Sequence, residues 1–210
     1  MSKGKEVISF KVITIGDSNV GKTSIIRRYV YNVFDEDTMS TIGLSFSFKE
    51  VILKSGEKIN LKLVDTAGQE KYHSLTTSYF KNSDCVLFVF DYGNLDSFNH
   101  IQKWVEDFTN NTTQIDIPKY LIGNKEDLDE KKVTKEMIEH FLKEKNYKFK
   151  STSAIKNDNH IEELFNEIAE DVMKKYLSSS DKGQKSKKLK NFNQKNIKGS
   201  SCICKFGPEN

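Results

Sequence analysis

The sequence predicts a three-layer α/β domain, with a six-stranded, mostly parallel sheet flanked by about five helices. Three observations predict it. Short β-branched segments alternate with longer segments of helical period. Cys85–Phe90 is apolar without interruption, as expected of a central strand covered on both faces. The glycine-rich segment Gly16–Thr23 joins the first strand-like segment to the first helix-like one, a connection typical of such sheets.

The first half of the chain contains four of the predicted elements. Phe10–Ile15 is short, apolar and β-branched, which predicts a strand, and Lys22–Val30 predicts a helix. Two segments of alternating polarity then flank a turn that contains Gly56, which predicts a hairpin of residues 46–53 and 59–64.

The second half repeats a strand and a helix three times. After the apolar strand, apolar residues at helical spacing predict a helix over Ser97–Phe108, with Trp104 in the core. Further strands are predicted at Tyr120–Gly123 and Tyr147–Lys150, separated by a helix that Thr134 caps and that runs to about Lys145. The apolar face of a last helix comprises Ile161, Leu164, Phe165, Ile168, Val172 and Met173.

The net charge of +3 is unevenly distributed over the 210 residues. Residues 178–210 contain eight lysines and two acidic residues, whereas residues 1–177 carry a net −3. We therefore predict a folded domain over 1–177 and a disordered, lysine-rich tail over 178–210. The acidic domain gives no reason to expect nucleic-acid binding.

Three cysteines are too few for a disulfide framework, and Cys85 is expected to be buried, so we expect a reduced, intracellular protein. No apolar segment reaches the roughly 18 residues of a membrane-spanning helix, and the first residues lack the apolar region of a signal peptide. The four histidines show no metal-ligand spacing and receive no predicted role.

The segment Gly16–Thr23 fits the phosphate-binding pattern G-x-x-x-x-G-K-[ST]. Its glycines permit the backbone N–H groups to surround an anion, and the following helix adds its positive N-terminal end. Lys22 is predicted to contact the β- and γ-phosphates, and the Thr23 hydroxyl to ligate Mg²⁺. The pattern alone does not distinguish ATP from GTP. The predicted phosphate-site residues are Gly16, Asp17, Ser18, Asn19, Val20, Gly21, Lys22, Thr23 and Ser24.

Two later segments, Asn124–Asp127 and Ser153–Ala154, also follow predicted strands and should lie at the same sheet edge. Asp127 can accept hydrogen bonds from N1–H and the 2-amino group of guanine, a pair of donors that adenine lacks. Asn124 and Lys125 can support the base, and the Ala154 N–H can reach guanine O6. Alone, Asn-Lys-Glu-Asp is equally compatible with a solvated turn, but together with the phosphate loop it indicates guanine.

These motifs, together with Ser40–Gly43, Asp65–Glu70 and Asp96–Phe98, resemble a small GTPase of the Ras superfamily, most closely the Rab branch. The resemblance covers about residues 8–177 and implies a GTP-dependent switch of vesicle traffic that hydrolyses GTP to GDP and phosphate with Mg²⁺. Two rival interpretations remain. One is a GTP-binding interaction module with negligible turnover, and the other is a soluble, non-prenylated Ras-like signalling GTPase.

The resemblance also implies roles for individual residues. Thr41 would contact the γ-phosphate and Mg²⁺, Asp65 would hold Mg²⁺ through water, and the Gly68 N–H would contact the γ-phosphate. Gln69 would orient the attacking water and, with Lys22 and Thr41, forms the predicted catalytic set. Phe34 would lie against the guanine ring; the alternative for Phe34 is an ordinary core position.

The two arginines of the chain, Arg27 and Arg28, lie more than a helical turn beyond Lys22, and neither is placed to reach the phosphates. We therefore expect slow intrinsic hydrolysis that needs a GTPase-activating partner. An exchange factor and effectors are the other expected partners of a monomer. The effector patch would comprise Phe46, Val64 and Tyr79, with Val64 replacing the Trp usual in Rab proteins.

The tail contains Cys202-Ile203-Cys204, which resembles the Rab signal for double geranylgeranylation, although six residues follow it here. Lipid chains plus the lysines of residues 182–198 would supply the two signals that stable membrane anchoring requires. The resemblance thus implies cycling between the cytoplasm and the cytosolic face of an intracellular membrane. The alternatives are two exposed thiols, or a nuclear or nucleic-acid signal in residues 185–190.

Overall fold

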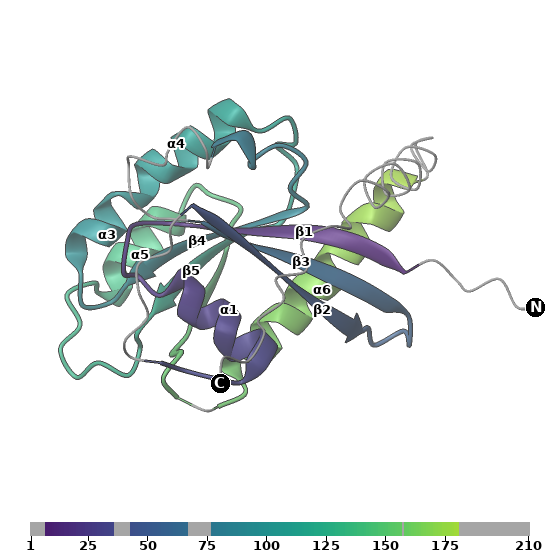
Figure 1. Ribbon diagram of the computed structural model, residues 1–210. Helices are drawn as coiled ribbons and strands as arrows, with labels where there is room; N and C mark the ends of the chain where they lie inside the picture. The colour runs from purple at the N-terminus through teal and green to yellow at the C-terminus, as the bar shows by residue number, and fades with distance from the viewer. Residues whose placement is uncertain (1–6, 36–42, 67–76, 157, 181–210) are drawn as a thin grey trace, which may run out of the picture. The chain divides into compact units, whose positions relative to one another are not determined.

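The computed structural model describes residues 7–35, 43–66, 77–156 and 158–180. The chain divides after Met173 into two compact units. In the first unit, six strands form one sheet in the order β2-β3-β1-β4-β5-β6 (Figure 1). The strands are β1 (Ile8–Ile15), β2 (Leu44–Ile52), β3 (Lys58–Thr66), β4 (Cys85–Asp91), β5 (Lys119–Asn124) and β6 (Lys148–Ser151).

The sheet is mostly parallel, as predicted. β2 pairs antiparallel with β3, and the other described pairings are parallel. Five helices lie within the described residues, and they confirm the predicted α/β fold class. These helices are α1 (Lys22–Tyr31), α3 (Leu95–Asn99), α4 (Ile101–Asn111), α5 (Lys135–Leu142) and α6 (His160–Ser180).

Local sequence signals explain several element ends. Gly56 has φ 83°, a conformation that glycine adopts without strain, and its N–H donates to Leu53 O at 2.8 Å in the β2–β3 turn. Thr134 caps α5 as predicted, because its hydroxyl accepts from the Met137 N–H. Asn94 caps α3 in the same way. α5 ends at Leu142, about one turn before the predicted end at Lys145.

The helix predicted over residues 97–108 is divided into α3 and α4 at His100. The backbone at His100 stays right-handed (φ −74°, ψ −13°), but its ψ lies far from the helical value near −42°. The Trp104 N–H still donates to His100 O at 3.1 Å, so α4 continues directly from α3. α6 runs to Ser180, three residues beyond the predicted end of the folded domain at residue 177. The division into a domain and a tail stays a prediction.

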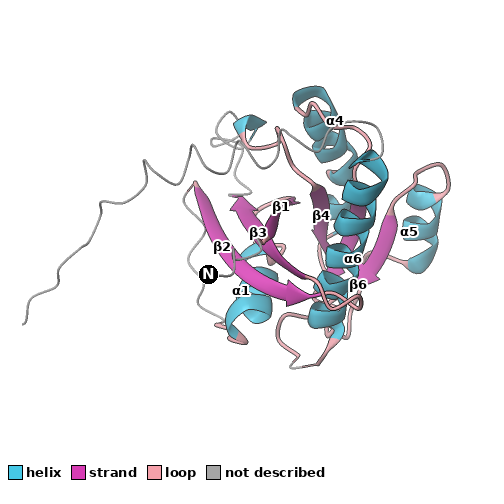
Figure 2. Ribbon diagram, turned by 90° about the vertical axis from the view of Figure 1, so that its right-hand side faces the viewer, coloured by secondary structure: helices cyan, strands magenta, loops and turns pink. Residues whose placement is uncertain are grey.

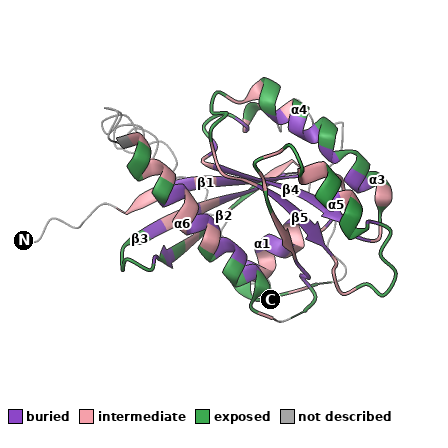
Figure 3. Ribbon diagram, turned by 180° about the vertical axis from the view of Figure 1, so that it is seen from behind, coloured by how far each residue is buried: buried purple, intermediate pink, exposed green. Residues whose placement is uncertain are grey.

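The core occupies both faces of the sheet, and all seven residues of β4 are buried (Figure 3). On one face, Phe98, Trp104 and Ile138 bring α3, α4 and α5 into one apolar cluster with the strands. Elsewhere Tyr29 of α1 stacks on Phe165 of α6, with ring centroids 4.0 Å apart. Figure 2 shows the strands between these helices. No helix among the described residues is both long and apolar enough to span a bilayer.

Parallel pairing aligns the strand ends that precede the predicted motifs. β1 ends at Ile15, directly before the glycine-rich loop, and β5 ends at Asn124. Asp91 at the end of β4 is in register with Asn124, and Gly123 is in register with Ser151 at the end of β6. The fold therefore brings three predicted site segments to one edge of the sheet.

Candidate functional site

The loop between β1 and α1 depends on two glycines. Gly21, with φ 93°, lies so close to β5 that a Cβ there would be 2.1 Å from Asn124 Nδ2. A Cβ on Gly16, whose φ is 151°, would lie 2.2 Å from Val89 O. Larger residues at either position would collide with the strand ends. The cradle-like loop therefore fits a phosphate group approached by backbone N–H groups.

Lys22 is the first residue of α1, and it is 5% exposed. Its Nζ donates to Gly16 O at 2.8 Å and to Asp17 O at 2.6 Å, so the side chain folds back over the loop. Burial lowers the pKa of Lys22 to about 8, although Asp65 and Asp17 act in the opposite direction. A buried ammonium with carbonyl partners is well suited to an incoming polyphosphate, which would supply the missing negative charge.

Thr23 and Asp65 meet next to this lysine. The Thr23 hydroxyl donates to Asp65 Oδ2 at 2.7 Å, and Asp65, near the end of β3, is 2% exposed. No group of three or more His, Cys, Asp or Glu residues in the described part of the chain could hold a metal ion. A hydroxyl and one carboxylate instead fit Mg²⁺, which uses few protein oxygens and keeps waters and substrate phosphates as its other ligands.

Asn124 connects the glycine-rich loop to the predicted base-binding segments. This residue is 1% exposed, its Nδ2 donates to Val20 O at 2.9 Å, and its Oδ1 accepts from Thr152 Oγ1 at 3.2 Å. Next to it, Lys125 has φ 63° and its Nζ forms an ion pair with Asp91 Oδ2 at 2.7 Å. Because both side chains of Asn124–Lys125 are fixed by the protein, this segment is an ordered loop and not merely a solvated turn.

The segments containing Asp127 and Ser153 also lie together. The hydroxyl of buried Ser153 donates to Asp127 Oδ1, which holds that carboxylate beside the Thr152–Ala154 backbone. Arg28 of α1 reaches the same backbone, with its Nε donating to Ala154 O at 2.9 Å. Sequence reasoning gave Arg28 no role at this site, because its partner lies 126 residues along the chain.

Asp17 has side-chain partners that the sequence did not suggest. Trp104 Nε1 donates to Asp17 Oδ1 at 2.7 Å, and His100 Nδ1 lies 2.7 Å from Asp17 Oδ2. The predicted core position of Trp104 is confirmed, since this residue is 8% exposed. The only sequence signal for a polar role was that a buried indole N–H needs an acceptor.

Comparison with known proteins identifies the family. The Ras family model matches residues 11–174. A Rab-10 from Diplobatis ommata is 39% identical over 176 residues, covering 83% of this chain and 86% of that protein. A Rab-10 from Caenorhabditis elegans is 38% identical over 173 residues (82% and 85%), and human Rab-8B is 36% identical over 167 residues (79% of each). The chain belongs to the Ras family.

Membership makes the protein a Rab-like small GTPase that acts in vesicle trafficking. Such a protein binds GTP or GDP with Mg²⁺ and hydrolyses GTP, and its kinds of partner are exchange factors, GTPase-activating proteins and effectors. The individual site residues, by contrast, stay predictions. Five of them lie outside the described residues: Thr41, Gly68, Gln69, Cys202 and Cys204.

The structure does describe Phe34, the predicted base contact, and the three residues of the predicted effector patch. Phe34 follows α1, is half-buried and does not belong to the buried core, which disfavours the alternative of an ordinary core position. Within the predicted effector patch, Phe46 is 40% exposed and its ring centroid lies 5.6 Å from that of Tyr79. The prediction that Val64 belongs to this surface is wrong. Val64 is fully buried in the core cluster, so it offers a partner no area.

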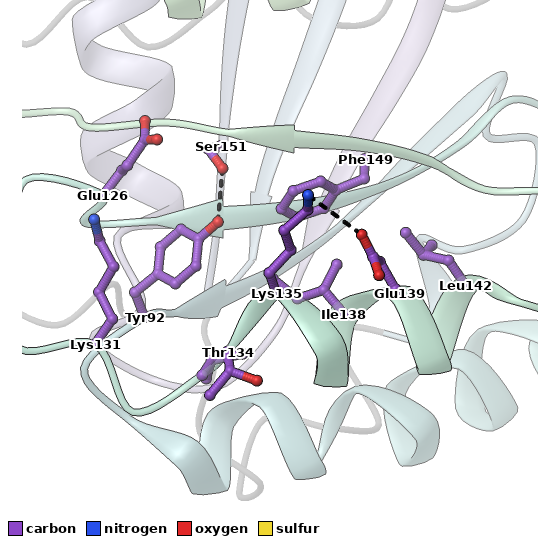
Figure 4. Close-up of a pocket in the computed structure, with 11 residues that line it drawn as sticks. Tyr92, Glu126, Lys131, Thr134, Lys135, Ile138, Glu139, Leu142, Phe149 and Ser151 are labelled. Atoms are coloured by element: carbon purple, nitrogen blue, oxygen red, sulfur yellow. Dashed lines mark hydrogen bonds and ion pairs between the residues drawn. The ribbon is translucent and has the colours of Figure 1, made fainter.

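A separate pocket of about 520 Å³ lies between α5 and β6 (Figure 4). Its interior is mainly apolar, and two pairs of its polar side chains contact each other: Tyr92 Oη with Ser151 Oγ at 2.6 Å, and Lys135 Nζ with Glu139 Oε1 at 3.5 Å. Of its lining residues, Glu126 alone falls within a predicted nucleotide-binding segment, and it is not one of the residues predicted to contact the nucleotide. We therefore assign the nucleotide to the loop edge and not to this pocket.

Proposed function

We propose that the predicted site residues bind Mg²⁺–GTP at the shared edge of β1, β3 and β5 and that their arrangement performs the switch reaction of this Rab-like GTPase. The observation that carries the assignment is the 2.9 Å hydrogen bond from Asn124 to Val20 O. It joins the phosphate loop to the base-binding segment, so one ligand can occupy both. Asp127 then accepts from the guanine edge, and Lys22 contacts the phosphates.

Hydrolysis at this site needs positioning and charge rather than a protein nucleophile. Lys22 offers its ammonium to the phosphates, and Thr23 and Asp65 offer oxygens to Mg²⁺, which when bound neutralises phosphate charge. Gln69 orients the water, and Thr41 contacts the γ-phosphate and Mg²⁺. The last two roles follow from the family resemblance.

Neither arginine is available to complete the charge stabilisation. Arg27 forms an ion pair with Asp35, and Arg28 donates to Ala154 O. We therefore propose an intrinsic rate on the order of 10⁻⁴ per second, raised by a partner that supplies a cation.

Single-turnover hydrolysis tests this assignment. Wild type should convert bound GTP slowly, and Gln69→Leu should be slower by about tenfold or more, because the water loses its orienting amide. Gln102→Leu makes the same chemical change on the exposed side of α4 and should leave the rate unchanged. Equal rates in wild type and Gln69→Leu would favour the interaction module with negligible turnover.

The exposed aromatic surface is the proposed effector patch. With Val64 buried, it consists of Phe46 and Tyr79, and Lys62 Nζ lies 4.5 Å from the Phe46 ring centroid. This position adds a cation to the surface and favours partners with an acidic or carbonyl-rich rim. Phe46→Ala should retain GDP binding and lose partners that bind only the GTP-loaded form, as measured by affinity capture on the two nucleotide states.

For membrane attachment, we propose a monomer whose residues 178–210 form a tail lipidated at Cys202 and Cys204, giving exchange between the cytoplasm and the cytosolic face of an intracellular membrane. Support comes from the eight lysines beside the two cysteines. Intact mass of the protein from its native cell decides between this and a soluble GTPase. An intact mass equal to that of the unmodified chain, differing from that of Cys202→Ser with Cys204→Ser only by the two exchanges of sulfur for oxygen, would establish the soluble alternative.

A further inference from the structure

Asp17 is the second residue of the phosphate loop, and both of its carboxylate oxygens have partners on one neighbouring segment. Oδ1 accepts from Trp104 Nε1 and Oδ2 from His100 Nδ1, each at 2.7 Å. A carboxylate only accepts, so His100 Nδ1 carries the proton in this contact. We call these three residues the Asp17 anchor. It links the loop to the first turn of α4 across more than 80 residues of sequence.

The same residue also contacts Lys22. Asp17 O accepts from Lys22 Nζ at 2.6 Å, so the anchor and the phosphate-binding lysine meet at one backbone unit. Movement of Asp17 would therefore displace a partner of that lysine. A free carboxylate in the phosphate loop would in addition repel a polyphosphate. Holding Asp17 against α4 prevents the movement, and the two donors partly offset the charge of its carboxylate.

The two donors of the Asp17 anchor, Trp104 and His100, differ in burial. The contact with Trp104 is therefore the more rigid of the two. Trp104 is 8% exposed and belongs to the apolar cluster that includes Phe108 and Val105 of its own helix. His100 is the residue between α3 and α4, with a side chain 55% exposed. A packed indole holds its N–H in one orientation, and this is what a positioning residue requires.

We propose that Trp104 and His100 are positioning residues of the nucleotide site, and that they slow nucleotide release by fixing Asp17 and, through its backbone, Lys22. This inference rests on the proposed assignment of the loop to phosphate binding. Trp104 is the single tryptophan of the chain. Its emission therefore reports directly on the contact with Asp17 and should change when the nucleotide leaves.

Release of tritiated GDP from the full chain with Mg²⁺ tests the proposal. Trp104→Phe keeps an aromatic ring and removes the N–H, and it should speed release by about fivefold, since a hydrogen bond to a charged group is lost. His100→Ala should act in the same direction by about twofold, because its exposed bond is weaker. Gln102→Ala, on the same helix with an exposed side chain, is the matched control and should release GDP at the wild-type rate.

A double-mutant cycle separates positioning from packing. Trp104→Phe should have little further effect on release in an Asp17→Ala background, because alanine carries no side-chain acceptor and both changes break the same contact. If Trp104→Phe acted only through the lost ring volume, it would speed GDP release by the same factor in the wild-type and the Asp17-substituted protein. Asp17→Ala should also shift the Trp104 emission of the folded protein. This readout needs no tryptophan substitution, so it remains decisive if Trp104→Phe does not fold.

Two results would overturn the inference. One is GDP release at the wild-type rate from both Trp104→Phe and Asp17→Ala, and the other is a Trp104 emission that neither Asp17→Ala nor removal of GDP changes. Both presuppose that wild type binds GDP. Failure of wild type to bind GDP would instead contradict the proposed nucleotide site.

Discussion

Arg28 supports the backbone of the Ser153–Ala154 segment from a distant helix, α1. The residue that follows this segment, Ile155, is 44% exposed. Arg28 Nε donates to Ala154 O at 2.9 Å, and its guanidinium also contacts Ile155 O at 3.4 Å. A helix residue thus fixes the backbone whose N–H is predicted to meet guanine O6.

Removing that support should weaken nucleotide retention. Arg28→Ala loses a charge-assisted bond to a carbonyl and should speed GDP release by about tenfold. The GDP release rate of Arg28→Lys should lie between those of wild type and Arg28→Ala. An ammonium keeps the positive charge, but it cannot reproduce the planar set of N–H donors of a guanidinium. Release of tritiated GDP, followed after adding excess unlabelled GDP, measures these rates.

Arg27→Ala is the matched control, since it removes the neighbouring arginine, whose ion pair with Asp35 is largely exposed. Its GDP release should stay near the wild-type rate. Equal acceleration by Arg27→Ala and Arg28→Ala would show that the positive charge of α1, and not the bond to Ala154, is responsible.

Contiguous residues of the site were predictable, and those that depend on distant contacts were not. Gly16–Thr23 carries its chemistry in eight adjacent residues whose spacing is itself the evidence. Arg28 and His100 act on partners 126 and 83 residues away, which no local pattern encodes. Val64 was misplaced for a related reason, because burial at the end of a strand depends on what packs over it.

At the scale of elements, the short edge strand β6 depends on α6. β6 has four residues and pairs with β5 alone among the described strands. Lys148 Nζ contacts Glu167 at 2.8 Å and Asp171 at 2.6 Å, and Lys150 Nζ contacts Glu167 at 2.7 Å. Since β6 leads into Ser153–Ala154, these ion pairs help to place the base-binding segment.

Glu167 should stabilise the fold in a pH-dependent way. Burial alone would raise its pKa, but hydrogen bonds from Lys148 and Lys150 outweigh burial and lower the pKa below 4.5. Folding therefore favours the charged carboxylate, so its contribution is complete above pH 4.5 and is lost as pH falls below that value. Glu167→Gln should lower the free energy of unfolding by about 0.5–1 kcal/mol at pH 7, a small value because the pairs are partly exposed.

Urea unfolding at pH 7 and at about pH 3 measures this difference. The loss caused by Glu167→Gln should shrink at the lower pH, because protonation of the wild-type carboxylate progressively removes the charge that the two lysines stabilise. Glu163→Gln, an exposed position on the same helix, should change little at either pH. A Glu167→Gln effect of the same size at both pH values would contradict an ionic origin.

For the whole molecule, the order of strands and helices was predictable because each has its own period, apolar run or cap. The division of one predicted helix at His100 was not, since ψ at a single residue decides it. The charge division is a property of the sequence alone: the first 177 residues carry −3, and the last 33 carry +6. With this distribution, the tail can be attracted to an anionic bilayer although the nucleotide-binding domain carries a net negative charge.

This division predicts how the unlipidated full chain behaves with vesicles. It should bind vesicles containing phosphatidylserine, because each lysine near the surface contributes about 1 kcal/mol. Raising salt to about 0.5 M should abolish binding, since screening shortens the range of the attraction. Changing Lys185, Lys187, Lys188 and Lys190 to Gln should weaken it strongly while GDP release stays at the wild-type rate, as measured by vesicle sedimentation beside GDP exchange. Binding that persists in high salt, or in that variant, would show that apolar contacts and not the tail's charge attach the unlipidated protein.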